Sequence, residues 1–252
     1  ALDVGDLPLR HHRPSSTGWV ALVGGGPGDP GLVTTRGRRL LAEADVVVVD
    51  RLAPRALLDE LDPGVVVVDA GKTAGNHPLP QEQINQLLVE HAQAGRRVVR
   101  LKGGDPFVLG RGGEEAVACV AAGVPVEVVP GVTSAVAVPA AAGIPVTHRG
   151  RSRQVTVASG HEGLDWATLA RLEGTLVLLM GVSGLASTTR ELVAHGKPPD
   201  TPVAVVESGF TPQQRTTVGT LGTIAELARE RDVRPPAVVV VGTVVDLHEL
   251  LG

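Results

Sequence analysis

The sequence has 252 residues, 43% of them hydrophobic, which is enough apolar material for one large domain or two modest ones. Its formal net charge of -4 excludes a general nucleic-acid surface, and its 2% of aromatic residues leave out the stacking platforms of single-stranded nucleic-acid binders. The apolar runs are too short to cross a bilayer, no secretory signal is visible, and the single cysteine, Cys119, excludes an internal disulfide and indicates a reducing compartment.

The chain opens with a polar segment, residues 1–18, which lacks periodicity and is expected to be a tail or linker. Trp19 to Val23 is apolar, as in a buried strand. A turn rich in glycine and proline then leads to a helical pattern from Thr34 to Ala44. These segments form the first βα unit.

The turn contains Gly26-Pro27-Gly28-Asp29-Pro30-Gly31, which has the G-x-G-x-x-G spacing of a dinucleotide-binding loop, and Asp50 ends the next strand where that fingerprint requires an acid. A hydride-transfer enzyme is therefore one hypothesis. Against it, Pro27 and Pro30 have no backbone N–H to offer a pyrophosphate, and Thr34 starts the helix too late. A P-loop is disfavoured because no Gly-Lys-Ser/Thr sequence follows.

Two valine strands come next, and both place polar side chains at their exits. Val46 to Val49 ends in Asp50 and Arg51, and Val65 to Val68 leads through a short turn to Lys72. Continuous apolar runs of this length predict fully buried parallel strands.

Two helices with apolar faces are predicted on either side of the next strand. Pro80 to Ala94 carries His91 on its apolar side, where we expect a packed histidine because no second ligand stands at i+4. Glu114 to Ala122 carries Cys119, which is predicted to be a packed side chain rather than a reactive thiol.

The stretch from Val98 to Glu115 joins these helices and opens as an apolar strand that breaks at Gly103, Gly104 and Asp105. Ligands of open α/β sheets lie outside the carboxyl ends of strands, so this turn predicts a small molecule against bare main chain. Asp105 could bind ribose hydroxyls. The alternative is a tight turn whose acid only caps the following helix.

A further strand, Val126 to Val129, breaks at Pro130, and Thr133 and Ser134 can then cap a helix or bond a ligand. The residue composition changes after Gly143, where a proline and several basic residues follow. We therefore expect an N-terminal α/β domain over 19–143, a linker over 144–153 and a C-terminal α/β domain over 154–252.

The second half repeats the alternation of strands and helices more loosely. We expect strands at Val155–Ala158, Leu176–Met180, Val203–Val206 and Val238–Val241, the last again fully buried and parallel, helices at Trp166–Leu172, Leu185–His195 and Ile224–Arg231, and a hairpin arm at Arg215–Val218. The fold class is α/β, with two successive α/β domains facing each other across a ligand cleft.

Several motifs together resemble the tetrapyrrole methylase family, and the resemblance covers Trp19 to Val245. The motifs are Val23–Pro30, Asp50-Arg51-Leu52, Gly71-Lys72, Val98–Glu115, Val128–Ala135, Gly143–Arg149 and Met180-Gly181. This set is far more specific than a lone glycine motif.

The resemblance implies a homodimer that binds S-adenosylmethionine between its two domains and methylates two ring carbons of uroporphyrinogen III to give precorrin-2 for sirohaem or cobalamin synthesis. Methyl transfer from a sulfonium requires no metal, and we expect the protein in the cytoplasm. It implies Asp50 as proton acceptor and Lys72 as proton donor; the alternatives are a capping or ion-paired acid and a solvated loop lysine. The cofactor-lining residues it implies are Pro27, Gly103, Gly104, Asp105, Val108, Thr133, Ser134, Met180, Gly209 and Ala237.

Four aromatic residues common in the family are replaced here by Val49, Leu109, Ala141 and Leu179. These departures leave the class intact but alter the expected pocket shape. A precorrin-4 methylase and a non-catalytic tetrapyrrole-binding domain therefore stay open as alternatives, beside the hydride-transfer enzyme.

The substrate is rich in carboxylates, so a chain of negative net charge needs a local basic patch to hold it. Arg149, Arg151 and Arg153 would project from one side of an extended segment and could each grip a carboxylate in bidentate fashion. A solvated basic linker is the alternative. Arg51 and Arg111 are further candidates for substrate binding.

Overall fold

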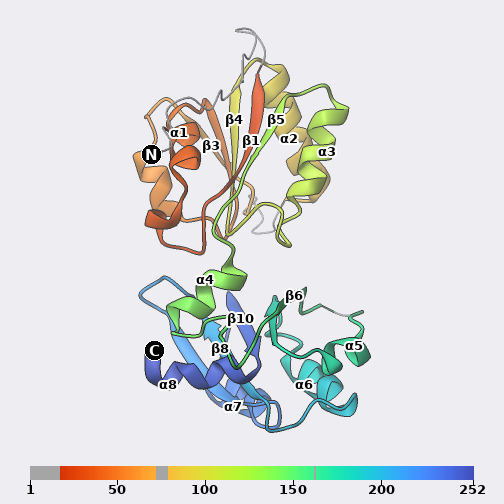
Figure 1. Ribbon diagram of the computed structural model, residues 1–252. Coiled ribbons are helices and arrows are strands. Elements are labelled where there is room, and N and C mark those ends of the chain that lie inside the picture. Colours follow the sequence, from red (N-terminus) through yellow and green to blue (C-terminus); the bar gives the residue numbers. More distant parts are fainter. Residues whose placement is uncertain (1–17, 72–78, 162) are drawn as a thin grey trace, which may run out of the picture.

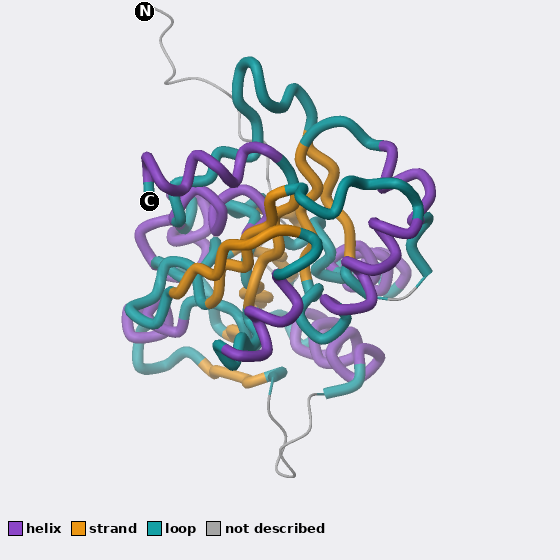
Figure 2. Tube along the Cα trace, turned by 90° about the horizontal axis from the view of Figure 1, so that it is seen from below, coloured by secondary structure: helices purple, strands orange, loops and turns teal. Residues whose placement is uncertain are grey.

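Two five-stranded sheets, one above the other, organise the chain into two lobes (Figure 1). The computed structural model describes residues 18–71, 79–161 and 163–252. Seen from below, most of the strands lie toward the middle of the molecule with helices around them, and one strand lies near its rim (Figure 2). No helix in these residues combines the length and the apolar composition that a membrane crossing requires.

The first sheet is entirely parallel, in the order β3-β2-β4-β1-β5. Its strands are β1 (Trp19–Gly24), β2 (Val46–Val49), β3 (Val66–Asp69), β4 (Arg97–Lys102) and β5 (Val126–Val129). Its helices are α1 (Thr35–Ala42), α2 (Gln81–Gln93) and α3 (Gly112–Ala121), with the short 3₁₀ helices η2 (Pro30–Leu32) and η3 (Arg55–Glu60).

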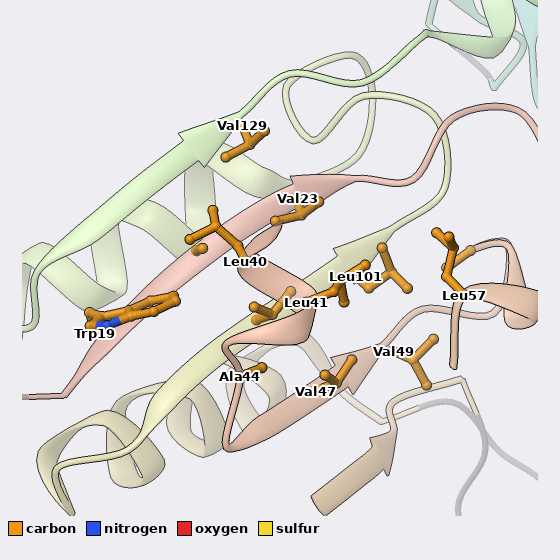
Figure 3. Packing of buried hydrophobic residues seen from close by; sticks show 13 residues of the cluster. Trp19, Val23, Leu40, Leu41, Ala44, Val47, Val49, Leu57, Leu101 and Val129 are labelled. Carbon is orange, nitrogen blue, oxygen red and sulfur yellow. The ribbon is translucent and has the colours of Figure 1, made fainter. Parts of the chain in front are cut away.

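Side chains alternate between two cores on the faces of this sheet. Trp19 and Val23 of β1 pack with Leu40 and Leu41 of α1 on one face (Figure 3). Val20 and Leu22 face α2 and α3 on the other, in the core that holds Cys119. Cys119 is fully buried, which confirms the predicted packing; burial raises the pKa of its thiol to about 11 and keeps it unreactive.

Neighbouring strands β1 and β4 send their chains to opposite faces, since β1 leads to α1 and β4 leads to α3. Such a switch point leaves a crevice at the carboxyl ends of the two strands. The glycine turn after β1 and the Gly103–Asp105 turn after β4 both lie there.

One valine strand of the first sheet is less buried than predicted. Val66 and Val67 of β3 are each 46% exposed, because β3 ends the sheet and pairs only with β2. An apolar run shows that a strand suits a core, but not whether it has neighbours on both sides.

The second sheet is mixed, in the order β6-β7-β10-β8-β9. Its strands are β6 (Val155–Ser159), β7 (Thr175–Leu179), β8 (Pro202–Glu207), β9 (Arg215–Thr220) and β10 (Ala237–Val241). Its helices are α5 (Trp166–Arg171), α6 (Leu185–Ala194) and α7 (Ile224–Glu230), followed by η4 (Thr243–Leu247) and α8 (His248–Leu251), which the sequence analysis did not predict.

The prediction of a parallel strand at Val238–Val241 is wrong, although its burial is confirmed. β10 is antiparallel to both β7 and β8. The predicted hairpin arm is present as β9, antiparallel to β8, and it reverses the chain before β10. The composition of a valine run predicts that the strand is buried, whereas the direction of the strand depends on the connections before and after it.

Helix α4 (Ser134–Ala141) packs on the second sheet, although the predicted N-terminal domain, 19–143, includes it. Ala135 and Val138 share a core with Val177 and Val240. Figure 1 places α4 at the top of the lower lobe. Since α4 carries small apolar residues on all sides, its sequence predicts burial but not which sheet buries it. We propose that the domains meet at residues 130–133 rather than at the predicted linker over 144–153.

Candidate functional site

A cavity of about 580 Å³ lies between the lobes, a size typical of small-molecule sites. Its first-lobe walls are the segments that follow β1, β2, β4 and β5, as the switch-point rule predicts. Its second-lobe walls are the segment after β7, the β8–β9 turn and the segment leading into β10.

Main chain meets main chain behind the cavity wall at Gly104. Gly26 and Gly104 form an isolated bridge, with Gly104 N donating to Gly26 O over 2.7 Å and Gly26 N donating to Gly104 O over 3.2 Å. A Cβ on Gly131 would overlap Gly104 O and the backbone of Gly24. The three strand ends therefore converge only because these positions carry no side chain.

The same contacts argue against a dinucleotide-binding loop. Gly25 N donates to Lys102 O, Gly26 N to Gly104 O and Gly31 N to Asp29 Oδ1. These three amides are engaged within the protein and Pro27 and Pro30 supply none, so most of the loop's amides are withheld from a pyrophosphate.

Asp105 clips the β4 turn to the chain after β5. Its Oδ1 accepts from Phe107 N at 2.8 Å and its Oδ2 accepts from Gly131 N at 3.0 Å. The tight turn considered as the alternative is therefore present, but Asp105 does not cap α3, whose N-cap is Arg111. Asp105 also lines the cavity, and each oxygen keeps a lone pair for a ligand hydroxyl.

Asp50 lies at the exit of β2, on the cavity wall, with its side chain 35% exposed. Its Oδ1 is 3.4 Å from Nη2 of Arg100, a guanidinium that is 2% exposed. Arg100 also donates to Glu115 Oε1 from Nε, at 3.0 Å, and to Val48 O from Nη1, at 3.3 Å.

Lys102 joins this buried group, with Nζ 3.1 Å from Glu115 Oε1. Burial, and then the nearby Arg100 charge, lower the pKa of the Lys102 ammonium, while Glu115 opposes the shift. The sequence analysis missed Arg100, Lys102 and Glu115. Their signal was available: the two cations alternate with apolar residues in a buried strand, which requires an internal counter-charge.

The second lobe supplies strained backbone to the cavity. Met180 and Ser208 have φ of 59° and 48°, and Leu109 of the first lobe has φ of 52°. Positive φ at non-glycine residues is costly and concentrates at ligand sites. The two lobes also approach each other closely here: a Cβ added to Gly28 would lie only 3.2 Å from Gly209 O of the second lobe.

All ten residues predicted to line the cofactor lie on the cavity wall. They are Pro27, Gly103, Gly104, Asp105, Val108, Thr133, Ser134, Met180, Gly209 and Ala237. Of the four replaced aromatics, Leu109 and Leu179 face the cavity, whereas Val49 is buried in the first core. The wall also includes His161 and Arg55, which the sequence analysis did not single out.

The predicted geometry of Arg149, Arg151 and Arg153 is wrong. His148 and Ser152 form a bridge that closes a tight turn, with Gly150 at φ 84°, so the segment is not extended. Arg151 donates to Asp246 Oδ2 at 2.6 Å and to Thr243 O at 2.8 Å. A glycine between arginines allowed the turn, and η4 supplied the partners.

The other predicted polar residues have different positions. Arg51 is exposed on the cavity wall. Arg111 precedes α3 with φ 57° and pairs with Glu114 through two hydrogen bonds of 2.9 and 2.7 Å. Lys72, the predicted proton donor, lies outside the described residues.

Comparison with known proteins gives a consistent assignment. A sequence model of the tetrapyrrole (corrin/porphyrin) methylases matches residues 20–225. An S-adenosyl-L-methionine-dependent uroporphyrinogen III methyltransferase of Methanosarcina barkeri is 55% identical over 242 residues, covering 93% of this chain and 95% of its own. A siroheme synthase of Thioalkalivibrio sulfidiphilus is 49% identical over 239 residues, and the chain spans about half (49%) of its length.

Two solved structures resemble the whole chain. A uroporphyrin-III C-methyl transferase of Thermus thermophilus, complexed with S-adenyl homocysteine, has a TM-score of 0.79 and 43% identity, covering 91% of this chain and 99% of its own. A cobalt precorrin-4 methyltransferase has a TM-score of 0.81 and 30% identity, covering 90% and 95%.

The close approach of Gly131 to Gly24 and Gly104 predicts that two similar substitutions change the free energy of unfolding differently. Gly131→Ala should destabilise the protein by about 1–3 kcal/mol, because its methyl group must displace the backbone of β1 and β4. Gly113→Ala, where a Cβ meets nothing within 4 Å, should be neutral or stabilising by up to about 1 kcal/mol. Urea unfolding measures both; equal stabilities would contradict the close approach.

Proposed function

This chain belongs to the tetrapyrrole methylase family, and we propose that it methylates two ring carbons of uroporphyrinogen III with S-adenosylmethionine, giving precorrin-2 for sirohaem or cobalamin synthesis. The observation that carries the proposal is the cavity between the lobes, whose wall holds every residue that the family pattern assigns to the methyl donor.

The cavity fits the methyl donor by its chemistry. Bare main chain at Gly103 and Gly104 admits close approach, Asp105 offers acceptor lone pairs to ribose hydroxyls, and Val108 and Met180 offer apolar contact. When bound, S-adenosylmethionine supplies an electrophilic methyl group on a sulfonium. The protein holds this donor against an electron-rich ring carbon, a task of positioning.

We propose that Asp50 accepts the proton that the macrocycle loses, from a position other than the methylated carbon, once the new carbon–carbon bond has formed. A carboxylate at a strand exit, on the cavity wall and partly open to solvent, can take up a proton and pass it to water. Arg100 Nη2 orients the carboxylate from the protein side. Lys72 stays our proposed proton donor.

For the substrate carboxylates we propose Arg51 as the first contact, because it is exposed on the cavity wall. The proposed secondary contacts are three exposed arginines: Arg149 within the 148–152 turn, Arg153 directly after it, and Arg111. Arg151 is engaged by Asp246 and is less suited to the role.

The resemblance to a cobalt precorrin-4 methyltransferase, with its TM-score of 0.81, favours a second candidate with the same chemistry on a different macrocycle. Identity of 55% to a uroporphyrinogen III methyltransferase, against 30% to the precorrin-4 enzyme, supports the first. Incubation with uroporphyrinogen III and labelled S-adenosylmethionine separates them, since only the first candidate yields a doubly methylated product.

We also propose that the protein acts as a cytoplasmic homodimer. Val117 and Val120 are 70% and 65% exposed on α3, and exposed apolar side chains of this kind suit a subunit interface. Light scattering after size-exclusion chromatography measures the mass; a monomer at micromolar concentration would contradict the dimer.

Asp50→Asn should abolish turnover and leave affinity for S-adenosylhomocysteine near that of the unmodified protein. An amide keeps the shape of the carboxylate but cannot take up a proton. Calorimetry gives the affinity and product absorbance gives the turnover. Turnover at the unmodified rate would reduce Asp50 to a structural role.

Asp105→Ala should weaken S-adenosylhomocysteine binding by roughly 1.5–3 kcal/mol, because the Phe107 and Gly131 amides lose a charged acceptor and the β4 turn loosens. Asp165→Ala is the matched control. Asp165 also accepts a hydrogen bond from a backbone amide, that of Thr168, but it lies outside the cavity wall. Calorimetry on both variants decides; equal affinities would contradict this role of Asp105.

Arg51→Ala should raise the Michaelis constant for uroporphyrinogen III several-fold at low ionic strength, with the difference shrinking as salt screens the charge. Affinity for S-adenosylhomocysteine should stay constant. Arg190→Ala, which removes one exposed positive charge on α6, controls for the change in net charge. The same Michaelis constant in both variants would transfer the substrate contact to Arg111 or to Arg149.

A further inference from the structure

Glu115 closes the loop that follows β4. Lys102 is the last residue of β4, Glu115 lies in the first turn of α3, and the chain between them includes Gly103, Gly104 and Asp105 of the cavity wall. The two side chains meet at 3.1 Å, with Lys102 4% exposed and Glu115 fully buried. A buried ion pair therefore joins both ends of this cavity loop.

The same carboxylate oxygen also holds Arg100. Glu115 Oε1 accepts from Lys102 Nζ, from Arg100 Nε at 3.0 Å and from Gln81 Nε2 at 3.3 Å. Arg100 then reaches Asp50 with its Nη2. One atom thus connects the cavity loop to the carboxylate at the exit of β2.

The charges of this cluster leave Asp50 sensitive to any change in it. Two cations, Arg100 and Lys102 of β4, face one buried anion, Glu115 of α3, and Asp50 is the second anion that they face. The exposed ion pair of Arg111 and Glu114, at the start of α3, also interacts electrostatically with Glu115 and Lys102, and α2 donates the neutral amide of Gln81 to Glu115. Buried charges interact strongly, so each substitution here alters the electrostatic potential at Asp50.

We propose that Glu115 is a positioning residue that couples the methyl-donor loop to Asp50, by holding Lys102 at the base of the loop and Arg100 behind the carboxylate through a single oxygen. The inference rests on the proposed function for the role of Asp50. The contacts among Glu115, Lys102 and Arg100 do not depend on it.

Replacing Glu115 or Lys102 by an uncharged residue should shift the pH profile of methyl transfer in opposite directions. Glu115→Gln removes an anion, so the excess positive potential keeps Asp50 ionised to lower pH and weakens it as a base. The acid limb then moves to lower pH, and the single-turnover rate at neutral pH falls about tenfold. Lys102→Met removes a cation, so the acid limb moves to higher pH.

The double variant Lys102→Met, Glu115→Gln keeps the net charge of the cluster and should return the acid limb close to its original position. All three variants open the base of the loop, so each should weaken S-adenosylhomocysteine binding about tenfold. Glu115→Asp should recover part of the affinity. Glu226→Gln, which breaks an exposed ion pair with Arg229 on α7, is the control and should change neither quantity.

The measurements are calorimetric affinity for S-adenosylhomocysteine and single-turnover methylation of uroporphyrinogen III across pH, on variants with native circular dichroism. Unchanged affinity in all three variants overturns the proposal, as do acid limbs that move in the same direction. If Glu115→Gln does not fold, the charge-balanced double variant and Glu115→Asp decide. An unmodified enzyme that binds S-adenosylhomocysteine without methylating uroporphyrinogen III refutes the proposed function and with it the coupling to Asp50, and affinity then tests only whether Glu115 holds the loop.

Discussion

Three strand ends meet without side chains between them at Gly24, Gly104 and Gly131, and the site follows from this contact. Because the backbones of β1, β4 and β5 approach so closely, the turns after them converge on one edge of the parallel sheet. Asp105 can then reach the amide of Gly131 from the neighbouring turn, and bare main chain at Gly103 and Gly104 forms part of the cavity wall.

The two lobes contribute different materials to the cavity. The parallel sheet brings glycine turns and Asp50 at its carboxyl edge, while the mixed sheet brings turns whose backbone is held at positive φ, as at Met180 and Ser208. The lobes meet where Gly28 approaches Gly209 O. A ligand there contacts both sheets, which explains why its wall residues are spread over the whole sequence.

Much of the site could be predicted from sequence because strand ends and glycines are local signals. Val46–Val49 has the predicted bounds, and the turns at Gly103 and Thr133 lie on the cavity wall. Tertiary packing decided the rest: the direction of β10, the sheet that buries α4, and the turn that separates Arg149 from Arg153. The two cations of β4, Arg100 and Lys102, indicate that a buried counter-charge is needed, but only the folded structure identifies Glu115 as that charge.

The seating of α4 makes the site in the first lobe depend on the second sheet. Its apolar residues Ala135 and Val138 pack on β7 and β10, which are synthesised later, so a ribosome-bound first lobe carries an uncovered helix at its end. Thr133 and Ser134 at the start of that helix line the cavity, and they reach their final positions only when the second sheet closes. The site is therefore complete only when both sheets have formed, through contacts between distant parts of the chain.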